Sequence, residues 1–213
     1  MAMGINTEPA SSEGFMGYVQ FDAKAGRAFR PDRSQDSSGN WTTDKVEITN
    51  TFTAVMDFEN LQVGWIAYPA ASAPIMHLVP LGQPFPAKPE GDKFKQGFQM
   101  VLKLGKDCGG DVRTFSHTAK AVLGPIDDLH DRYVREKADH PGQLPVVKLV
   151  TTKPITSGSG DKKSTSYTPV FDIIRWVDRP ADLGGAASAK QEEAPAPKPA
   201  PAPVATSDDD EEF

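Results

Sequence analysis

The sequence has little of what would identify a secreted, membrane or zinc-binding protein. It contains one cysteine, Cys108, which excludes an internal disulfide framework and cannot supply a cysteine-based zinc site alone. No stretch approaches the roughly 18 apolar residues that a membrane-spanning helix needs. The first residues include neither a basic segment nor an apolar one, so we expect no signal peptide. These shortages predict a soluble, cytoplasmic protein with no membrane partner.

The sequence also lacks the motifs of common catalytic sites. Its four histidines show no metal-ligand spacing, and no phosphate-binding loop pattern is present. The densest acidic cluster contains Asp127, Asp128 and Asp131, and we attribute it to a helix N-terminus, where the helix dipole favours acids. We therefore predict no catalytic residue, no metal and no cofactor. A metal-dependent nucleic-acid-processing enzyme that uses these three acids remains an alternative.

What the sequence has in excess is negative charge, and this charge lies at one end. The chain has 23 basic and 29 acidic residues among 213, a formal net charge of −6. Residues 181–213 hold eight acids and two bases, so they account for the whole excess and residues 1–180 are neutral in sum. An acidic protein normally repels nucleic acid. Here the acidity belongs to a tail, so a body that binds nucleic acid is not excluded.

The apolar pattern predicts a mainly β body of the α+β class over residues 15–180. Apolar and polar residues alternate over 46–58 and 93–104, which is typical of half-buried strands. Residues 22–40 are predicted to form a loop. The proline-rich stretch 69–92 is predicted as loop or extended edge, because proline lacks the donor of the β-ladder. Further strands are predicted at 15–21, 61–68, 146–152 and 168–177.

One helix is predicted within residues 116–139. We expect it to begin near Pro125, because proline is favoured at the first helical position and Asp127 and Asp128 would then lie in the first turn. The order of three strands, a helix and two strands is that of an OB-fold, a five-stranded Greek-key barrel with its helix between strands 3 and 4. We predict an OB-fold-like body, with residues 1–14 as a flexible N-terminus.

The end of the sequence has a different composition. The alternating alanine–proline run 194–203 cannot pack a core, and we predict a disordered, semi-rigid linker over 181–207. Acid runs usually keep a tail soluble, but a final phenylalanine adds nothing to solvation. We therefore expect the tip to be a ligand, with Phe213 in an apolar pocket of a partner protein and its carboxylate on a basic residue. The tip consists of Asp208, Asp209, Asp210, Glu211, Glu212 and Phe213.

With this linker and tip, the sequence resembles the single-stranded DNA-binding proteins of bacteria and their phages. Those proteins join an OB-fold to a disordered linker and an acidic tip that closes on an aromatic residue. The tip lacks the Ile-Pro before the final phenylalanine that typifies the bacterial housekeeping members, and it looks more like the phage replication versions. The resemblance implies a protein that coats single-stranded DNA in the host cytoplasm and recruits replication and recombination proteins through residues 208–213. Such a role is compatible with a homo-oligomer.

The body must then hold the DNA, through basic side chains and aromatic faces on which bases stack. Residues 88–120 and 145–169 each carry a surplus of three positive charges, and they include the predicted third strand and the basic loop 153–164. In OB-folds such strands and loops form the binding face. We predict DNA contacts from Lys93, Lys95, Lys103, Arg113, Lys148, Lys153, Lys162, Lys163, Trp41, Trp65 and Tyr167.

Other interpretations of the same residues stay open. Trp65 lies on a strand with Tyr68, and alternation puts the two rings on opposite faces, so at most one of them stacks and Trp65 is equally a core residue. The lysines are equally a solvated face. At the level of the whole chain, the alternative to DNA binding is a β-rich interaction or virion-assembly protein whose acidic tail docks on a basic partner.

Overall fold

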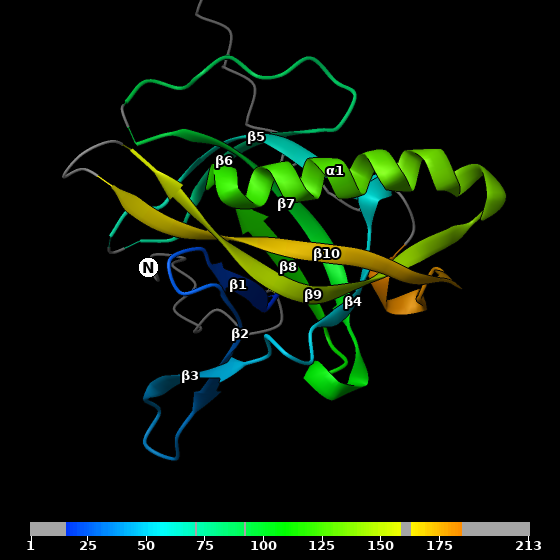
Figure 1. The fold of residues 1–213 in the computed structure, drawn as a ribbon. Helices are drawn as coiled ribbons and strands as arrows, with labels where there is room; N and C mark the ends of the chain where they lie inside the picture. Colours follow the sequence, from blue (N-terminus) through cyan, green and yellow to red (C-terminus); the bar gives the residue numbers. More distant parts are fainter. Residues whose placement is uncertain (1–15, 71, 92, 159–162, 185–213) are drawn as a thin grey trace, which may run out of the picture.

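The computed structural model describes residues 16–70, 72–91, 93–158 and 163–184 and shows a mainly β protein (Figure 1). Within these ranges there are ten strands and one α-helix, α1 (Lys120–Glu136). The mainly β class is confirmed, but the strands number ten rather than five. The strands are β1 (Tyr18–Asp22), β2 (Arg27–Gln35), β3 (Trp41–Glu47), β4 (Thr53–Met56), β5 (Gln62–Ala67), β6 (Ile75–Pro80), β7 (Lys95–Leu104), β8 (Val112–His117), β9 (Gln143–Ser157) and β10 (Ser164–Asp178).

The sheet is organised around β7. The C-terminal part of β7 pairs with β4 and its N-terminal part with β5, while β8 pairs along the opposite edge. The pairing order is β10-β9-β4-β7-β8-β1-β2-β3, with β6 added outside β5. Phe98, Met100 and Leu102 of β7 are at most 3% exposed and lie in the main core. The alternation over 93–104 therefore predicted this strand correctly, and its apolar face is the buried one.

The strand expected over 46–58 is interrupted. β3 ends at Glu47 and β4 begins at Thr53. Between them the backbone N–H of Thr51 donates to Ile48 O at 3.2 Å and closes a turn. Ile48 and Phe52 are each 2% exposed, so the alternation of apolar and polar residues continues through the turn. The sequence pattern therefore does not reveal that the strand is interrupted.

The loop expected over 22–40 is wrong, because most of these residues belong to strands. β1 runs parallel to β8 and antiparallel to β2, and β2 pairs in turn with β3. This N-terminal unit is therefore joined edge-on to the rest of the sheet. All seven residues of β3 are exposed, so β3 has no apolar period by which a sequence pattern could identify it.

The proline-rich stretch 69–92 contains β6, which pairs with β5 at the edge of the sheet. This agrees with the expectation of loop or extended edge. Gly64 allows β5 and β6 to approach closely, because a Cβ at this position would lie 2.1 Å from the carbonyl oxygen of His77.

The helix α1 begins at Lys120, so the expected start at Pro125 is wrong and Pro125 lies inside the helix. A proline cannot donate to the carbonyl four residues earlier, which is that of Ala121. The hydroxyl of Thr168 on β10 donates to this carbonyl oxygen at 2.7 Å. The strand therefore satisfies the acceptor that Pro125 leaves open. The helix buries one face, made of Val122, Ile126, Leu129 and Tyr133.

Replacing Thr168 with valine should lower the free energy of unfolding by about 1–3 kcal/mol, because the half-buried carbonyl of Ala121 loses its donor while the side-chain shape is kept. Urea denaturation measures the change. In a Pro125→Ala background the loss should be much smaller, since a backbone N–H at position 125 then donates to Ala121 O. Thr165→Val, at an exposed position of the same strand, should change stability by less than about 0.5 kcal/mol. Equal losses in both backgrounds would contradict this role of Thr168.

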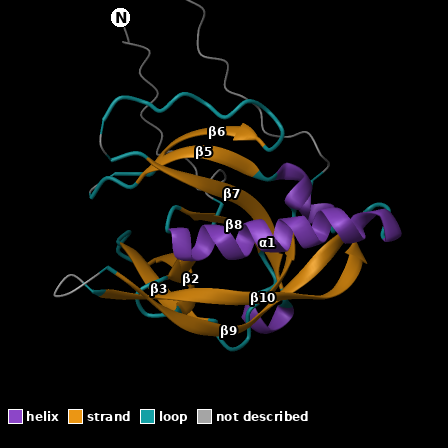
Figure 2. Cartoon of the chain, turned by 45° about the horizontal axis from the view of Figure 1, so that its top comes forward, coloured by secondary structure: helices purple, strands orange, loops and turns teal. Residues whose placement is uncertain are grey.

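The hairpin of β9 and β10 is longer than expected. The strands predicted at 146–152 and 168–177 are present but extend over Gln143–Ser157 and Ser164–Asp178. Consequently half of the predicted loop 153–164 is strand. Figure 2 shows α1 lying across the sheet between this hairpin and the side formed by β5, β6 and β7.

A buried ion pair fixes the end of β10. Arg179 donates to both carboxylate oxygens of Asp57, at 2.7 and 2.8 Å, and to Glu59 at 2.7 Å. Asp57 is only 1% exposed and also accepts from the side-chain amide of Asn60 at 2.7 Å. The hydrogen bond to Asp57 raises the pKa of the Arg179 guanidinium. Arg179 also donates to Gly184 O at 3.2 Å, so it sets the place from which the chain continues toward the linker.

Candidate functional site

A groove of about 630 Å³ lies on the outer face of the sheet, opposite the face that carries Phe98 and Met100. The side chains around it are mostly apolar, aromatic or hydroxyl-bearing, with Gln20 and His117 besides, and among the described residues no lysine, arginine, aspartate or glutamate lines it. Paired residues lie on the same face of a sheet, so Tyr18 and Thr114, which pair with each other, share the outer face, while Val19, Phe21 and His117 close the inner end of the groove. The lining includes Tyr18, Gln20, Tyr68, Met76, Thr114 and Ser116.

Two tyrosines present their rings at this groove. Tyr18, on β1, is 40% exposed, and Tyr68, just after β5, is 50% exposed. The Tyr68 hydroxyl lies 3.2 Å from the Ser116 hydroxyl on β8, which holds the ring over the sheet. Two half-exposed rings in an uncharged groove can accept flat, π-faced ligands.

The expectation that Trp65 stacks on DNA is not supported by its surroundings. Its indole N–H donates to Pro86 O at 2.8 Å, and its ring makes an edge contact with Phe85 at a centroid distance of 5.8 Å. Lys88 lies above the same ring at 5.8 Å. Trp65 therefore packs under the proline-rich stretch, on the side of α1, while its neighbour Tyr68 occupies the groove. Alternation did place the two rings on opposite faces, as expected.

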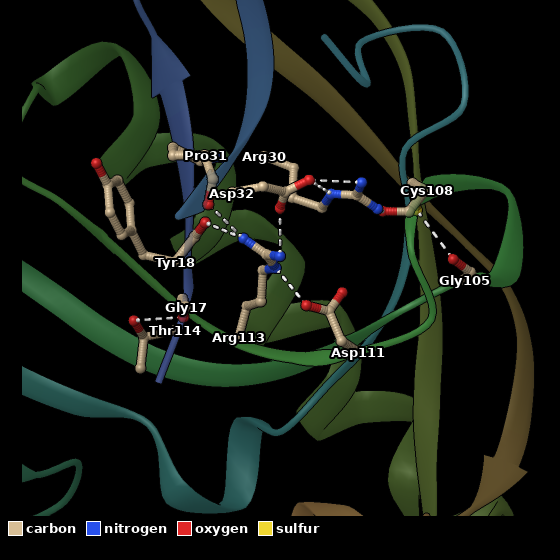
Figure 3. A network of polar contacts seen from close by, with 10 residues as sticks. All are labelled: Gly17, Tyr18, Arg30, Pro31, Asp32, Gly105, Cys108, Asp111, Arg113 and Thr114. Carbon is tan, nitrogen blue, oxygen red and sulfur yellow. Dashed lines mark hydrogen bonds and ion pairs between the residues drawn. The ribbon is translucent and has the colours of Figure 1, made fainter. Parts of the chain in front are cut away.

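Arg113 is the clearest correction to the predicted DNA contacts. It is 7% exposed, and its guanidinium donates to Asp32 at 2.6 Å, Asp111 at 2.7 Å and Pro31 O at 2.8 Å (Figure 3). A buried guanidinium with these partners cannot also reach a phosphate. Arg113 instead joins β8 to β2 and supports the groove from its inner side.

Arg30 completes this network. It donates to Asp32 at 2.7 Å and to Cys108 O at 3.0 Å (Figure 3). Burial would raise the pKa of Asp32, but the hydrogen bonds from Arg30 and Arg113 outweigh it and hold that pKa below 3.8. The carboxylate stays charged at neutral pH, and the N-terminal strands are fixed to the sheet that bears the groove.

His117 lies at the inner end of the groove with both ring nitrogens bonded. The backbone N–H of Ala119 donates to Nδ1 at 2.9 Å, so Nε2 holds the proton and donates to Phe21 O at 3.0 Å. This arrangement requires a neutral ring. Burial lowers the pKa of His117 below 6.5, although the Phe21 carbonyl and Asp22 act in the opposite direction.

The fold should lose stability as the pH falls below 6.5. In the unfolded chain His117 takes up a proton near its ordinary pKa of 6.5, while in the fold it does so only at lower pH. The unfolded state therefore binds more protons in this window, and its population rises as the pH falls. Urea titrations between about pH 7.5 and 5 measure the effect. His117→Gln should flatten the profile, whereas His77→Gln, at an exposed position, should leave it unchanged; the reverse outcome would contradict the assignment.

The predicted lysines fall into separate places. Lys95 on β7 is exposed and pairs with Ile66 on β5, and Ile66 pairs in turn with the groove residue Met76 on β6. Because paired residues share a face, Lys95 lies on the groove face of the sheet. Lys93, two residues before it, is also exposed. Lys103, near the other end of β7, donates to Asp182 at 2.6 Å, so the structure does not bring it to the groove.

The remaining predicted contacts lie on two hairpins. Lys148 and Lys153 are exposed on β9, and Lys163 is exposed just before β10. Tyr167 packs against the β1–β2 turn, where a Cβ on Gly26 would lie 2.8 Å from its ring. Trp41 is exposed on β3. Lys162 and the tip residues Asp208, Asp209, Asp210, Glu211, Glu212 and Phe213 lie outside the described residues.

The acids of the catalytic alternative lie exposed on α1, at Asp127, Asp128 and Asp131. Within the described ranges, no three His, Cys, Asp or Glu side chains are arranged so that they could hold a metal ion. Across the same part of the chain, no helix has both the length and the apolar character needed to cross a membrane.

Of the residues at the groove, sequence reasoning predicted Lys93 and Lys95 as DNA contacts, weighed Tyr68 only as the alternative to Trp65, and missed Tyr18. For Tyr18 a signal existed, because Val19 and Phe21 are core residues and alternation then turns Tyr18 outward. No protein-family model, curated protein or solved structure matches the chain.

Proposed function

We propose that the chain is a non-enzymatic, sequence-independent single-stranded DNA-binding protein that acts in phage DNA replication and recombination. The observation that carries this proposal is the uncharged groove with its two half-exposed rings, Tyr18 and Tyr68. The bases of a single strand have free π-faces that stack on such rings, and every base has such a face, so this binding tolerates any sequence.

Charge around the groove supports the same proposal. Lys93 and Lys95 are exposed beside it and form no ion pair within the part of the chain that the structure describes. Bases would occupy the uncharged floor while phosphates meet these lysines at the margin. The exposed lysines of the β9–β10 hairpin would add to this electrostatic attraction.

The strand order also supports an OB-fold-like arrangement inside the larger sheet. We take β4 and β5 together as the first strand, β7 and β8 as the second and third, and β9 and β10 as the fourth and fifth. The helix α1 then lies between the third and fourth strands, and β4 pairs with both β7 and β9. Strands 2 and 3 of an OB-fold carry its ligand face, and the groove includes Thr114 and Ser116 of β8.

In this proposal the acidic tip, residues 208–213, recruits replication and recombination proteins and competes with DNA for the body. Residues 185–213 continue from Gly184, and a fully extended chain of that length covers up to roughly 100 Å. β7, which runs from the Lys103 end to the groove end, is about 30 Å long. Chain length therefore allows the tip to reach the groove of its own body as well as a partner.

The direct test compares binding to oligo-dT and to duplex DNA at several salt concentrations, with and without magnesium. We expect preference for oligo-dT, with affinity that falls as salt rises because bound counterions are released. A protein truncated after Ser207 should bind oligo-dT more tightly, most clearly at low salt, since a competing acidic segment is removed.

Three results would contradict this proposal. Absence of binding to either DNA would favour an interaction or virion-assembly protein. Magnesium-dependent cleavage of the strand would favour an enzyme that uses Asp127, Asp128 and Asp131. Weaker binding after truncation would contradict the competition between the tip and DNA.

A further inference from the structure

The hairpin of β2 and β3 forms an arm that projects from the body (Figure 1). The last three residues of β2 and all seven of β3 are exposed, so the arm contributes nothing to the core beyond its base. Its tip is nevertheless ordered by hydrogen bonds: the carboxylate of Asp36 accepts from the backbone N–H groups of Ser38 and Asn40 at 2.8 and 2.9 Å. The Gln35 side chain donates to Gly39 O at 2.8 Å. An exposed arm that is rigid without a core suggests a surface kept for contact.

Strand register sets which arm residues share the groove face. Tyr18 pairs with the groove residue Thr114, and two residues further along β1 Gln20 pairs with Phe29. Alternation along β2 then puts Arg33 on the face of Phe29, and the pairing of Arg33 with Thr43 extends this face to β3. The residues of the arm on the groove face are therefore Arg33, Gln35, Trp41, Thr43 and Lys45.

The opposite face of the arm has a different chemistry. The hydroxyls of Ser34 and Thr42 lie 3.0 Å apart there, which confirms that Arg33 and Trp41 point the other way. Asp32 and Asp44 pair with each other in register on the Ser34 side. The cations Arg33 and Lys45 thus share the groove face with Trp41, while Asp32 and Asp44 lie on the other face. Glu47, at the base of the arm, pairs with Phe29 on the groove face and forms an ion pair with Arg27 at 3.0 Å.

Trp41 has an exposed ring that a neighbouring cation holds in place. The Arg33 guanidinium carbon lies 4.9 Å from the centroid of its ring, and the side chain is still 51% exposed. A guanidinium on one face of an indole holds the ring in place by a cation–π contact, and it leaves the other face for a second flat partner.

We propose that the arm is a second nucleobase-stacking site, so that a single DNA strand bound at Tyr18 and Tyr68 continues across β1 and β2 onto Trp41. This inference rests on the proposed function and adds to it an extended path. Neighbouring strands lie about 4.8 Å apart and each strand residue adds about 3.3 Å, so Trp41 is roughly 15–20 Å from Tyr18 across the sheet. Only an oligonucleotide long enough to cover this distance binds at both sites at once.

The test uses full-length protein and oligo-dT of two lengths, about 4 and about 16 nucleotides, which bracket the site sizes of single-strand-binding folds. Trp41→Ala should weaken binding of the long oligonucleotide roughly tenfold, as expected for one lost stacking contact. It should change binding of the short one, which the tyrosine groove holds alone, by less than about twofold. Trp41→Phe should restore most of the affinity.

Thr42→Ala is the matched control, because Thr42 is the next residue of β3 but lies on the opposite face, and it should behave as the wild type. Binding of both lengths by wild type with no effect of Trp41→Ala would overturn the second site and leave the proposed function intact. Failure of the wild-type protein to bind either oligonucleotide would overturn both. Unchanged unfolding midpoints ensure that the variants are folded.

Discussion

Replacing Arg179 with methionine should lower the free energy of unfolding by about 3–5 kcal/mol, the cost of breaking a buried ion pair by removal of one partner. The substitution leaves Asp57, 1% exposed, as a charged group with only the Asn60 amide among its described side-chain partners. It also releases Glu59 and Gly184 O from Arg179. Urea denaturation followed by tryptophan fluorescence measures the loss.

Two comparisons separate the ion pair from general effects of the substitution. Arg175→Met, on β10 at an exposed position with no ion pair among the described residues, should change stability by less than about 0.5 kcal/mol. A double variant, Asp57→Leu with Arg179→Met, should lose less stability than Arg179→Met alone, because no unpaired charge is then buried. If the double variant is the less stable one, the uncompensated carboxylate is not the cause.

The sequence predicted those parts of the fold in which a strand buries one face and exposes the other to solvent. β7 has this property, and so its alternation from 93 to 104 was informative. The arm strands lack it, because β3 is exposed on both faces. A strand that buries nothing has no hydrophobic period, and its pairing with β2 depends on backbone hydrogen bonds and turn geometry that composition does not reveal.

The start of the helix was wrong for a different reason. Pro125 is favoured at a helix start because its missing N–H costs nothing there. Inside a helix the same residue leaves one carbonyl without its donor, and here Thr168, far away in sequence, supplies one. A local rule failed because a tertiary contact compensated for the residue.

Among the site residues, Lys95 and Arg113 show what alternation can still decide. Both are cations next to or within strands of the same sheet, and by charge alone both were predicted to contact DNA. Arg113 is two residues before Phe115, a core residue at 2% exposure, so the period of two already directs it inward. Its partner Asp111 is only two residues away, but Asp32 comes from β2, distant in the sequence, and that contact could not be inferred.

Removing both groove rings, with Tyr18→Ala and Tyr68→Ala together, should weaken binding of oligo-dT by about 2–6 kcal/mol, since one stacked base contributes about 1–3 kcal/mol. This is the largest effect on binding that we expect from the proposed function. The two rings line one groove, so their contributions are expected to couple rather than to add. Fluorescence anisotropy of labelled oligo-dT, with each single variant measured beside the double one, gives both quantities.

The loss should come from stacking and not from charge, and the salt dependence distinguishes the two. Phosphate contacts set the slope of log K against log salt, so the double variant should keep the wild-type slope with a lower intercept, while Lys93→Ala with Lys95→Ala should reduce the slope. Phe85→Ala removes a 45% exposed ring on the side of α1 and should bind as the wild type does. Tyr68→Phe keeps the ring but loses the contact with Ser116, and it should retain most of the affinity. Wild-type affinity in the double tyrosine variant would mean that the groove does not hold the bases.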